Sequence, residues 1–510
     1  MALGAITLAT YYHDLYGVAR ADQLIYFYRT AKINDFWNLT FGAFDFNRTH
    51  SIGDFALFRP GLYFLLGVEK WLWGYNLLAW QATSLGLHVA VVLSLFAYFR
   101  GCLRGVGATL ECSWLPFAAS AFFATLYAGS EMVAWQHLGG YLLFCLLLVQ
   151  SAIWYRRFTA RPSAGRAAVL VICATLAAFT YELGVAGLGA YALLCALAAM
   201  RNRTDRRLYT LAAGHLLLAI VAYAAIDYLD YPAAATDLPH PPIERTAAVT
   251  VAYARQWTSE MFLPAATILY PGVRITADFK LSGTHPGNTM IVVALVAASL
   301  AAQRNRKRLR DVQMAVLFLG LGIVYTATIV AQRALPRGVE GQFFNNSYYA
   351  YTFALLFLLA AFHFVAVPCE PRTGPLAATI RSVIVVALLL ISAIGAGKIY
   401  VLMFNERHGY AEPIEQLITR INGLVRQHRG ERDFSFTVMP GCKGNPDLRW
   451  FSIQTTVKRS NYSIAWVMYP QYERDAGGKY LVRCDDASSG SGNRGSEASV
   501  RLVQESARAG

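Results

Sequence analysis

The sequence predicts an all-α membrane protein with about eleven transmembrane helices and a small C-terminal α/β appendage. Composition is the first reason: of the 510 residues, 56% are apolar and only 15% are charged, whereas soluble domains carry roughly 25% charged residues. The second is the mean hydropathy of +0.37. The third is a series of apolar runs near the roughly 20 residues that cross a bilayer as a helix. The eight cysteines are too few for a disulfide scaffold.

The apolar runs give the candidate spans in order. The run from Ala2 to Tyr12 is too short to span and has neither the basic n-region nor the small-residue cleavage site of a signal peptide, so we interpret it as the outer end of a first span. The runs 167–180 and 183–200 flank Glu182 and are either two short spans or one long broken helix. The ten further candidates are 76–99, 115–135, 138–155, 167–180, 183–200, 208–227, 288–303, 312–332, 346–367 and 382–403.

Basic residues assign the two sides of the membrane. A net charge of +14 in a soluble protein indicates nucleic acid or another anionic partner. Here, if the spans alternate, five short loops on one side hold 17 basic and 4 acidic residues. The positive-inside rule makes that side cytoplasmic and excludes nucleic acid as the explanation of the charge. The outer segments are then 13–75, 228–287, 333–345 and 404–510.

The outer segments differ in character. Segment 13–75 ends in an Arg-Pro pair and an amphipathic stretch, 60–75, which we expect in the membrane interface with Trp71 and Trp73 as anchors. Segment 228–287 contains an apolar piece, 257–270, which is long enough to dip into the bilayer without crossing it.

The domain boundaries follow from this pattern. Residues 1–403 form the membrane domain, residues 404–486 a small extracytoplasmic α/β domain, and the Gly/Ser-rich residues 487–510 a disordered tail. Within the small domain, apolar residues at helical spacing over 414–425 predict a helix, and alternation over 434–438 and 463–469 predicts strands. Whether Cys442 and Cys484 form a disulfide stays open.

Ionisable residues in or beside the bilayer are the candidate functional groups, because they are costly there. No phosphate loop, Gly-x-Ser-x-Gly sequence or metal-ligand cluster of His and Cys occurs. Glu131, Glu182 and His88 lie in or at the ends of apolar spans, where the alternative to a functional role is a hydrogen bond between helices. Asp22 follows the first span closely, at the level where a carboxylate reaches the headgroup of a lipid-linked substrate.

The order of these pieces resembles the membrane glycosyltransferases of the GT-C fold, including the protein O-mannosyltransferases and their bacterial relatives. The resemblance covers roughly residues 1–365. The matching segments are Asp22 after the first span, Phe58-Arg59-Pro60-Gly61, Gly74-Tyr75-Asn76, Ser84-Leu85-Gly86-Leu87-His88, Tyr127 to Trp135 with Glu131, Tyr181-Glu182, Arg337 and Ser347-Tyr348-Tyr349.

The chain also departs from the family. It has Asp22-Gln23 where two adjacent acidic residues are common, Tyr127-Ala128 in place of His-Pro, and Tyr181 in place of Lys. These departures leave the identity of the donor open, and with it the activity of this member.

The resemblance implies an inverting sugar transfer from a polyprenyl-phosphate donor to a glycan, lipid or protein acceptor on the outer face of a bacterial inner membrane. Asp22 is then the catalytic carboxylate, and the leaving phosphate needs cations, for which guanidinium groups are suited. The cationic candidates are Arg59, Arg333 and Arg337. Glu131, Glu182 and His88 support these groups. The resemblance implies no certain cofactor, and a divalent metal ion stays open.

Three alternatives remain. A lipid-linked sugar transporter (flippase) would use intramembrane carboxylates, although its usual second copy of a broken helix is not found in this sequence. A polysaccharide polymerase or ligase would share the lipid-linked substrate. A non-catalytic scaffold would only display the C-terminal domain. Convergence of Asp22, Arg59 and Arg337 on one outward cavity would favour the transferase.

Overall fold

The computed structural model is predominantly helical. It describes residues 1–16, 36–37, 58–74, 76–105, 114–135, 138–230, 242–261, 309–331, 347–365, 375–408, 435–438, 481–484 and 500–503. The helices of the first half are α1 (Ala2–Thr10), the 3-10 helix η1 (Tyr12–Tyr16), α4 (Pro60–Trp73), α5 (Leu77–Gly105), α6 (Trp114–Ala124), α7 (Gly129–Ala134), α8 (Gly139–Ala160), α9 (Ala164–Thr180), α10 (Leu183–Arg201) and α11 (Arg206–Asp230). Those that follow are α12 (Ile243–Met261), α15 (Leu309–Ile329), α17 (Ser347–Val365) and α18 (Pro375–Glu406).

Five of the described helices, α5, α8, α10, α11 and α18, are long and apolar enough to cross a membrane. Four shorter apolar helices, α6, α9, α15 and α17, lie beside them. Multi-pass membrane architecture is therefore supported, while the count of about eleven spans stays a prediction. The expected span 288–303 lies outside the described residues.

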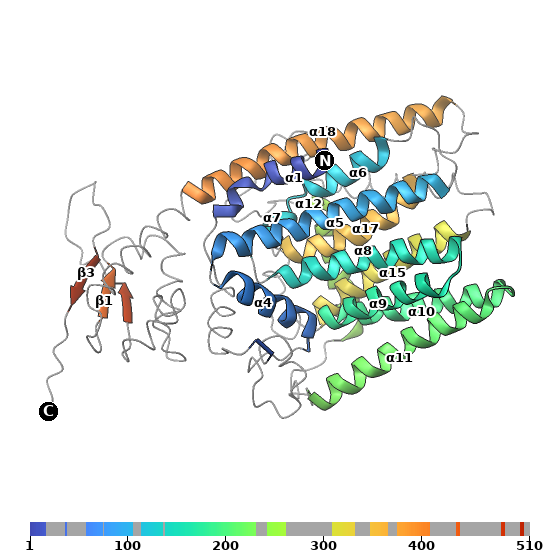
Figure 1. The fold of residues 1–510 in the computed structure, drawn as a ribbon. Helices are drawn as coiled ribbons and strands as arrows, with labels where there is room; N and C mark the ends of the chain where they lie inside the picture. Colours follow the sequence, from blue (N-terminus) through green and yellow to red (C-terminus); the bar gives the residue numbers. More distant parts are fainter. Residues whose placement is uncertain are drawn as a thin grey trace.

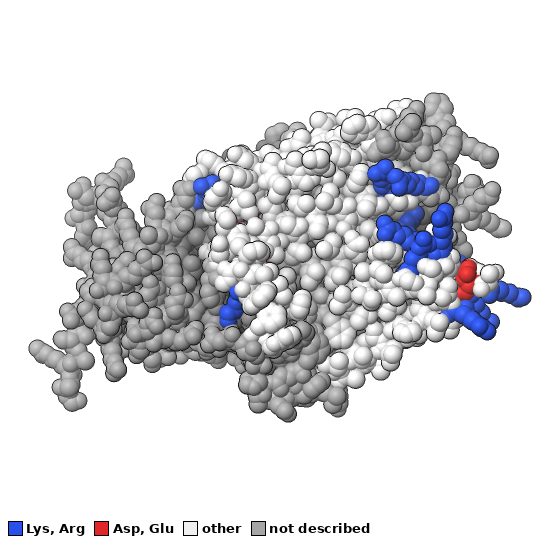
Figure 2. Space-filling model, viewed as in Figure 1, with Lys and Arg blue, Asp and Glu red and all other residues white. Residues whose placement is uncertain are grey.

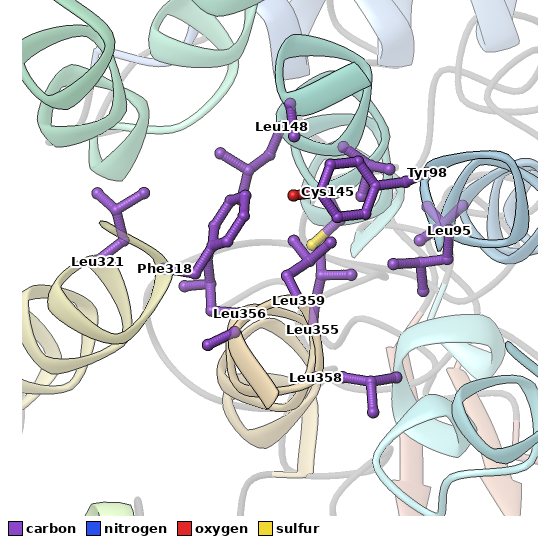
Figure 3. Packing of buried hydrophobic residues seen from close by; sticks show 14 of the residues in the cluster. Leu95, Tyr98, Cys145, Leu148, Phe318, Leu321, Leu355, Leu356, Leu358 and Leu359 are labelled. Carbon is purple, nitrogen blue, oxygen red and sulfur yellow. The ribbon is translucent and has the colours of Figure 1, made fainter. Parts of the chain in front are cut away.

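Helices α5, α8, α15 and α17 form the centre of the bundle, and α11 and α18 lie at its two edges (Figure 1). In the centre, leucines, Tyr98, Cys145 and Phe318 from these four helices meet in one apolar cluster (Figure 3). The edge helices instead expose large apolar side chains, such as Leu218 on α11 and Val383 on α18. An apolar exterior of this kind suits contact with lipid rather than with water.

Two reciprocal hydrogen bonds join α5 to α17. His88 Nδ1 of α5 lies 2.8 Å from Tyr351 Oη of α17, and Tyr98 Oη of α5 lies 2.7 Å from His363 Nε2 of α17. Because the residue numbers rise together along both helices, α5 and α17 run in the same direction. This agrees with the alternation of spans that the basic loops predict.

The pair α9 and α10 decides between the two readings of the chain around Glu182. Helix α9 ends at Thr180, the backbone of Tyr181 is extended, and α10 begins at Leu183. The two helices pack along each other, and the Cα of Gly184 lies so near the backbone of Ala177 and Ala178 that no side chain fits between them. The chain therefore reverses at Tyr181-Glu182, and two helices rather than one broken helix flank the glutamate.

The expected span 115–135 is interrupted, because α6 ends at Ala124 and α7 begins at Gly129. Thr125 Oγ1 donates back to Ala121 O at 3.0 Å. The carbonyl of Leu126 accepts a turn hydrogen bond from Gly129 N at 2.9 Å and a second hydrogen bond from Tyr11 Oη at 3.1 Å. The side chain of Tyr11, the residue that ends α1, thus adds a hydrogen bond to the backbone where the helix breaks.

The basic residues gather at one end of the bundle, as Figure 2 shows for the visible face. There α8 passes into α9 and α10 into α11. The exposed basic residues of these connections are Arg157, Arg161, Arg201, Arg203, Arg206 and Arg207. Since α9 begins at this end and α10 returns to it, the Tyr181-Glu182 turn lies at the opposite end, which we call the Arg59 end after the residue that contacts this turn.

The C-terminal segment contributes three short strands, β1 (Ser435–Val438), β2 (Leu481–Cys484) and β3 (Val500–Val503). β1 is central, parallel to β2 and antiparallel to β3. β1 falls in the strand predicted over 434–438. β3, in contrast, lies within the tail expected to be disordered, where three of the four residues, Val500, Leu502 and Val503, are apolar. The helix predicted over 414–425, the strand over 463–469 and Cys442 lie outside the described residues, so the α/β domain stays a prediction.

Candidate functional site

The start of α4 is anchored against the α9–α10 turn. Pro60 occupies the first helical position, which its fixed φ and missing N–H favour. The ring of Phe58 packs 5.8 Å from Phe179 and 5.4 Å from Tyr223. Gly61 lies directly against Thr180, the last residue of α9. These contacts hold Arg59, the residue before the helix, beside Glu182.

Arg59 and Glu182 form a two-point ion pair. Arg59 Nε donates to Glu182 Oε2 at 2.7 Å and Nη2 donates to Oε1 at 2.6 Å. The Arg59 side chain is 6% exposed and that of Glu182 is 23% exposed. Short distances and parallel geometry mark a strong, charge-assisted pair. Within the described residues, Arg59 Nη1 makes no hydrogen bond, so the edge of the guanidinium that faces away from Glu182 keeps N–H donors for a further acceptor.

Two tyrosines complete the surroundings of the guanidinium. Arg59 Cζ lies 4.3 Å from the centroid of the Tyr181 ring and 5.7 Å from that of Tyr141. The Tyr181 hydroxyl donates to the Tyr141 hydroxyl at 3.0 Å. Aromatic faces attract a cation, so the rings stabilise the buried charge and fix its plane.

The charge of Arg59 is maintained despite its burial. Burial by itself lowers the pKa of Arg59, but the Glu182 carboxylate and the hydroxyls of Tyr141 and Tyr181 outweigh it, so the pKa stays well above its usual value. The guanidinium is therefore a permanent cation at the Arg59 end of the bundle. Such a group is able to bind a phosphate oxygen through Nη1.

The other sequence-predicted residues fall into two groups. His88 is fully buried. Its Nδ1 is hydrogen-bonded to Tyr351 Oη and its Nε2 lies 3.4 Å from Ala124 O, so the ring connects α5 with α17 and α6. Glu131 lies half-buried in the first turn of α7, next to Gly129, which approaches the His88 ring. The structure thus brings Arg59 and Glu182 together, and it places His88 in a separate contact between α5 and α17. Asp22, Arg333 and Arg337 lie outside the described residues, so their convergence with Arg59 stays a prediction.

Glu69 is a buried acidic residue of α4 that the sequence analysis missed. It is 1% exposed, and neither carboxylate oxygen has a hydrogen-bond partner in the part of the chain that the structure describes. Burial raises the pKa of Glu69 well above its usual value. The signal was present in the spacing of Leu62, Leu66 and Glu69, which places the acid on the buried stripe of α4.

No metal centre is evident among the residues that are described, since no three His, Cys, Asp or Glu side chains gather there in positions to hold an ion. The site therefore consists of a fixed cation, its carboxylate and aromatic hydroxyls. Comparison of the chain with protein-family models, with curated proteins and with solved structures finds no match. The function is accordingly argued from the site and from the sequence.

Proposed function

We propose that the protein is an inverting membrane glycosyltransferase, which moves a sugar from a polyprenyl-phosphate donor to an envelope glycan, lipid or protein acceptor. The observation that carries the proposal is the buried Arg59–Glu182 pair at the end of the bundle opposite the basic loops. A lipid phosphate that leaves at the membrane surface requires a cation there, and Arg59 is held ready in one orientation. The resemblance to GT-C enzymes supports the same assignment.

In this mechanism the acceptor hydroxyl attacks the anomeric carbon while the bond from that carbon to the phosphate oxygen breaks. The acceptor proton passes to Asp22, and the electron pair of the broken bond leaves with the polyprenyl phosphate. Arg59 binds a leaving phosphate oxygen through Nη1, with Arg333 and Arg337 as further cations. Glu182 is a positioning residue that holds Arg59. The membrane is then a bacterial inner membrane, with the basic loops in the cytoplasm and the C-terminus outside.

Substitution of Asp22 tests the proposal directly. Asp22→Asn removes the base and keeps the size of the side chain, so sugar transfer in membranes should fall about 10²- to 10⁴-fold. Asp35→Asn, in the same outer segment, is the matched control and should keep full activity. Full activity of Asp22→Asn would contradict the mechanism.

The alternatives predict different products. A flippase moves the lipid-linked sugar across the bilayer and leaves its glycosidic bond intact, whereas a transferase releases polyprenyl phosphate. A polymerase or ligase releases the lipid as well but extends or transfers a chain rather than one sugar. Reconstituted vesicles with a radiolabelled lipid-linked hexose distinguish the three, because the label is translocated, joined to an acceptor or built into a polymer.

A further inference from the structure

Two hydrogen-bond donors are buried without a partner on neighbouring helices. Trp257 of α12 is 0% exposed and Tyr325 of α15 is 1% exposed. Neither Trp257 Nε1 nor Tyr325 Oη has a hydrogen-bond partner among the described residues. Buried polar groups are nearly always paired, so two unpaired donors side by side call for an explanation.

The two donors belong to one aromatic cluster. The Trp257 ring lies 6.1 Å from the Tyr325 ring and 5.7 Å from the Phe353 ring, measured between centroids. The polar neighbours of the Tyr325 hydroxyl are the hydroxyls of Tyr141, Tyr349 and Thr352, and none of them makes a hydrogen bond of good geometry with it. We call Trp257, Tyr325, Phe353 and Tyr349 the inner aromatic cluster.

This cluster adjoins the candidate site. The Tyr349 ring lies 6.5 Å from the Tyr141 ring, and the Tyr141 hydroxyl accepts from Tyr181 beside Arg59. Tyr141 and Tyr349 stand in the first turns of α8 and α17, at the Arg59 end. A series of aromatic side chains therefore leads from the Arg59 guanidinium to the two unpaired donors.

We propose that the inner aromatic cluster binds the sugar ring of the lipid-linked donor, with Trp257 Nε1 and Tyr325 Oη donating to oxygens of that sugar. This inference rests on the proposed function, for which it names the position of the sugar. No charged side chain belongs to the cluster, so a phosphate would lie there without a counter-charge, whereas an uncharged ring of hydroxyls needs none. Aromatic walls with a few convergent polar groups are typical of sites for small neutral ligands.

Two kinds of lipid, with and without a sugar, separate recognition of the sugar from recognition of the phosphate. Binding of undecaprenyl-phosphate glucose, mannose and galactose is compared with binding of undecaprenyl phosphate, on protein in a detergent that has no sugar headgroup. Tyr325→Phe removes one donor, so the affinity for the sugar-bearing lipid that binds best should fall roughly 3- to 10-fold. The affinity for undecaprenyl phosphate should not change.

Tyr191→Phe is the matched control. Tyr191 is also fully buried with an unpartnered hydroxyl, but it lies on α10 against Tyr155, outside the inner aromatic cluster. It should leave both affinities unchanged. Trp257→Phe should reproduce the selective loss of Tyr325→Phe. The unfolding temperature of Tyr325→Phe should change little, because the deleted hydroxyl makes no hydrogen bond of good geometry.

The outcomes distinguish the two proposals. If the wild-type protein binds both kinds of lipid and Tyr325→Phe weakens neither, or weakens both equally, the sugar site is wrong and the transferase proposal stands. If Tyr325→Phe leaves the affinity for the sugar-bearing lipid unchanged, Trp257 Nε1 and Tyr325 Oη are hydrogen-bonded to ordered water only. If the wild-type protein binds none of these lipids, both proposals fall.

Discussion

Arg59 and Glu182, separated by 123 positions in the sequence, form a two-point ion pair with N–O distances of 2.6 and 2.7 Å. The pair joins the start of α4 to the turn between α9 and α10. It therefore links the helix that we expect at the membrane interface to a hairpin within the bundle. Substitutions of Arg59 and Glu182 can measure how much the pair contributes to folding stability, separately from its proposed role in binding phosphate.

Loss of both partners of this pair should cost less stability than the sum of the two single losses. Removing one member of a fully buried pair costs about 3–5 kcal/mol; because Glu182 is 23% exposed, we expect Glu182→Leu to cost roughly 2–3 kcal/mol after allowance for solvent. The double variant Arg59→Met/Glu182→Leu should lose less than the sum of the two single variants. Unfolding temperatures in detergent measure these differences, and strictly additive losses would show that the two residues do not interact.

The hydrogen bond between His88 and Tyr351 should contribute to stability rather than to catalysis. Tyr351→Phe leaves a buried ring nitrogen unpaired and should cost about 1–3 kcal/mol. A double-mutant cycle with His88→Phe should give a coupling energy of about 0.5–3 kcal/mol. Tyr98→Phe, which breaks the equivalent bond to His363, is the matched comparison. A large loss of transfer with no loss of stability would instead place His88 in the chemistry.

Glu69 should make stability depend on pH. Since burial raises the pKa of its carboxyl in the folded state, the folded state binds more protons than the unfolded state at pH values between the two pKa values. Stability is then greatest below the unfolded pKa of about 4.3 and falls as pH rises through the raised pKa of the folded state. Unfolding temperatures from pH 5 to 8 should decrease for the wild type and stay more nearly level for Glu69→Gln. Parallel curves for the two proteins would contradict this.

Close packing at Gly61 should be required for the Arg59 site. A Cβ at this position would lie 2.9 Å from the Cα of Thr180, so Gly61→Ala forces α4 away from α9 and moves Arg59 from Glu182. Overpacking of this kind costs about 1–3 kcal/mol. Gly214→Ala on α11, where a Cβ meets nothing within 4 Å, is the control and should be neutral or slightly stabilising. Equal behaviour of the two variants would refute the packing argument.

The helices could be predicted from the sequence to the extent that each is apolar along its length. The runs 76–99 and 138–155 correspond to α5 and α8, because hydropathy is a local property. α12 was missed, since its charged residues, beginning with Glu244 and Arg245, conceal an amphipathic helix from a search for apolar runs. The break between α6 and α7 was missed because its stabilising partner, Tyr11, comes from a distant part of the chain.

The candidate site, like the helices, could be predicted from the sequence only in part. Arg59, Glu182 and His88 could be singled out from their types and positions, because a charged or polar group near an apolar span is unusual. Their partners could not be assigned. Tyr181 stood out only as a departure from the family pattern, although it lies over the Arg59 guanidinium.

The sequence by itself determined that this is a multi-pass membrane protein with one strongly basic side, because composition, run length and charge placement are properties of short segments. Only the tertiary structure decided that Glu182 neutralises Arg59 and that His88 bonds Tyr351. Those pairings depend on which helix ends meet, and helix packing is selected by the fit of whole surfaces rather than by any local pattern.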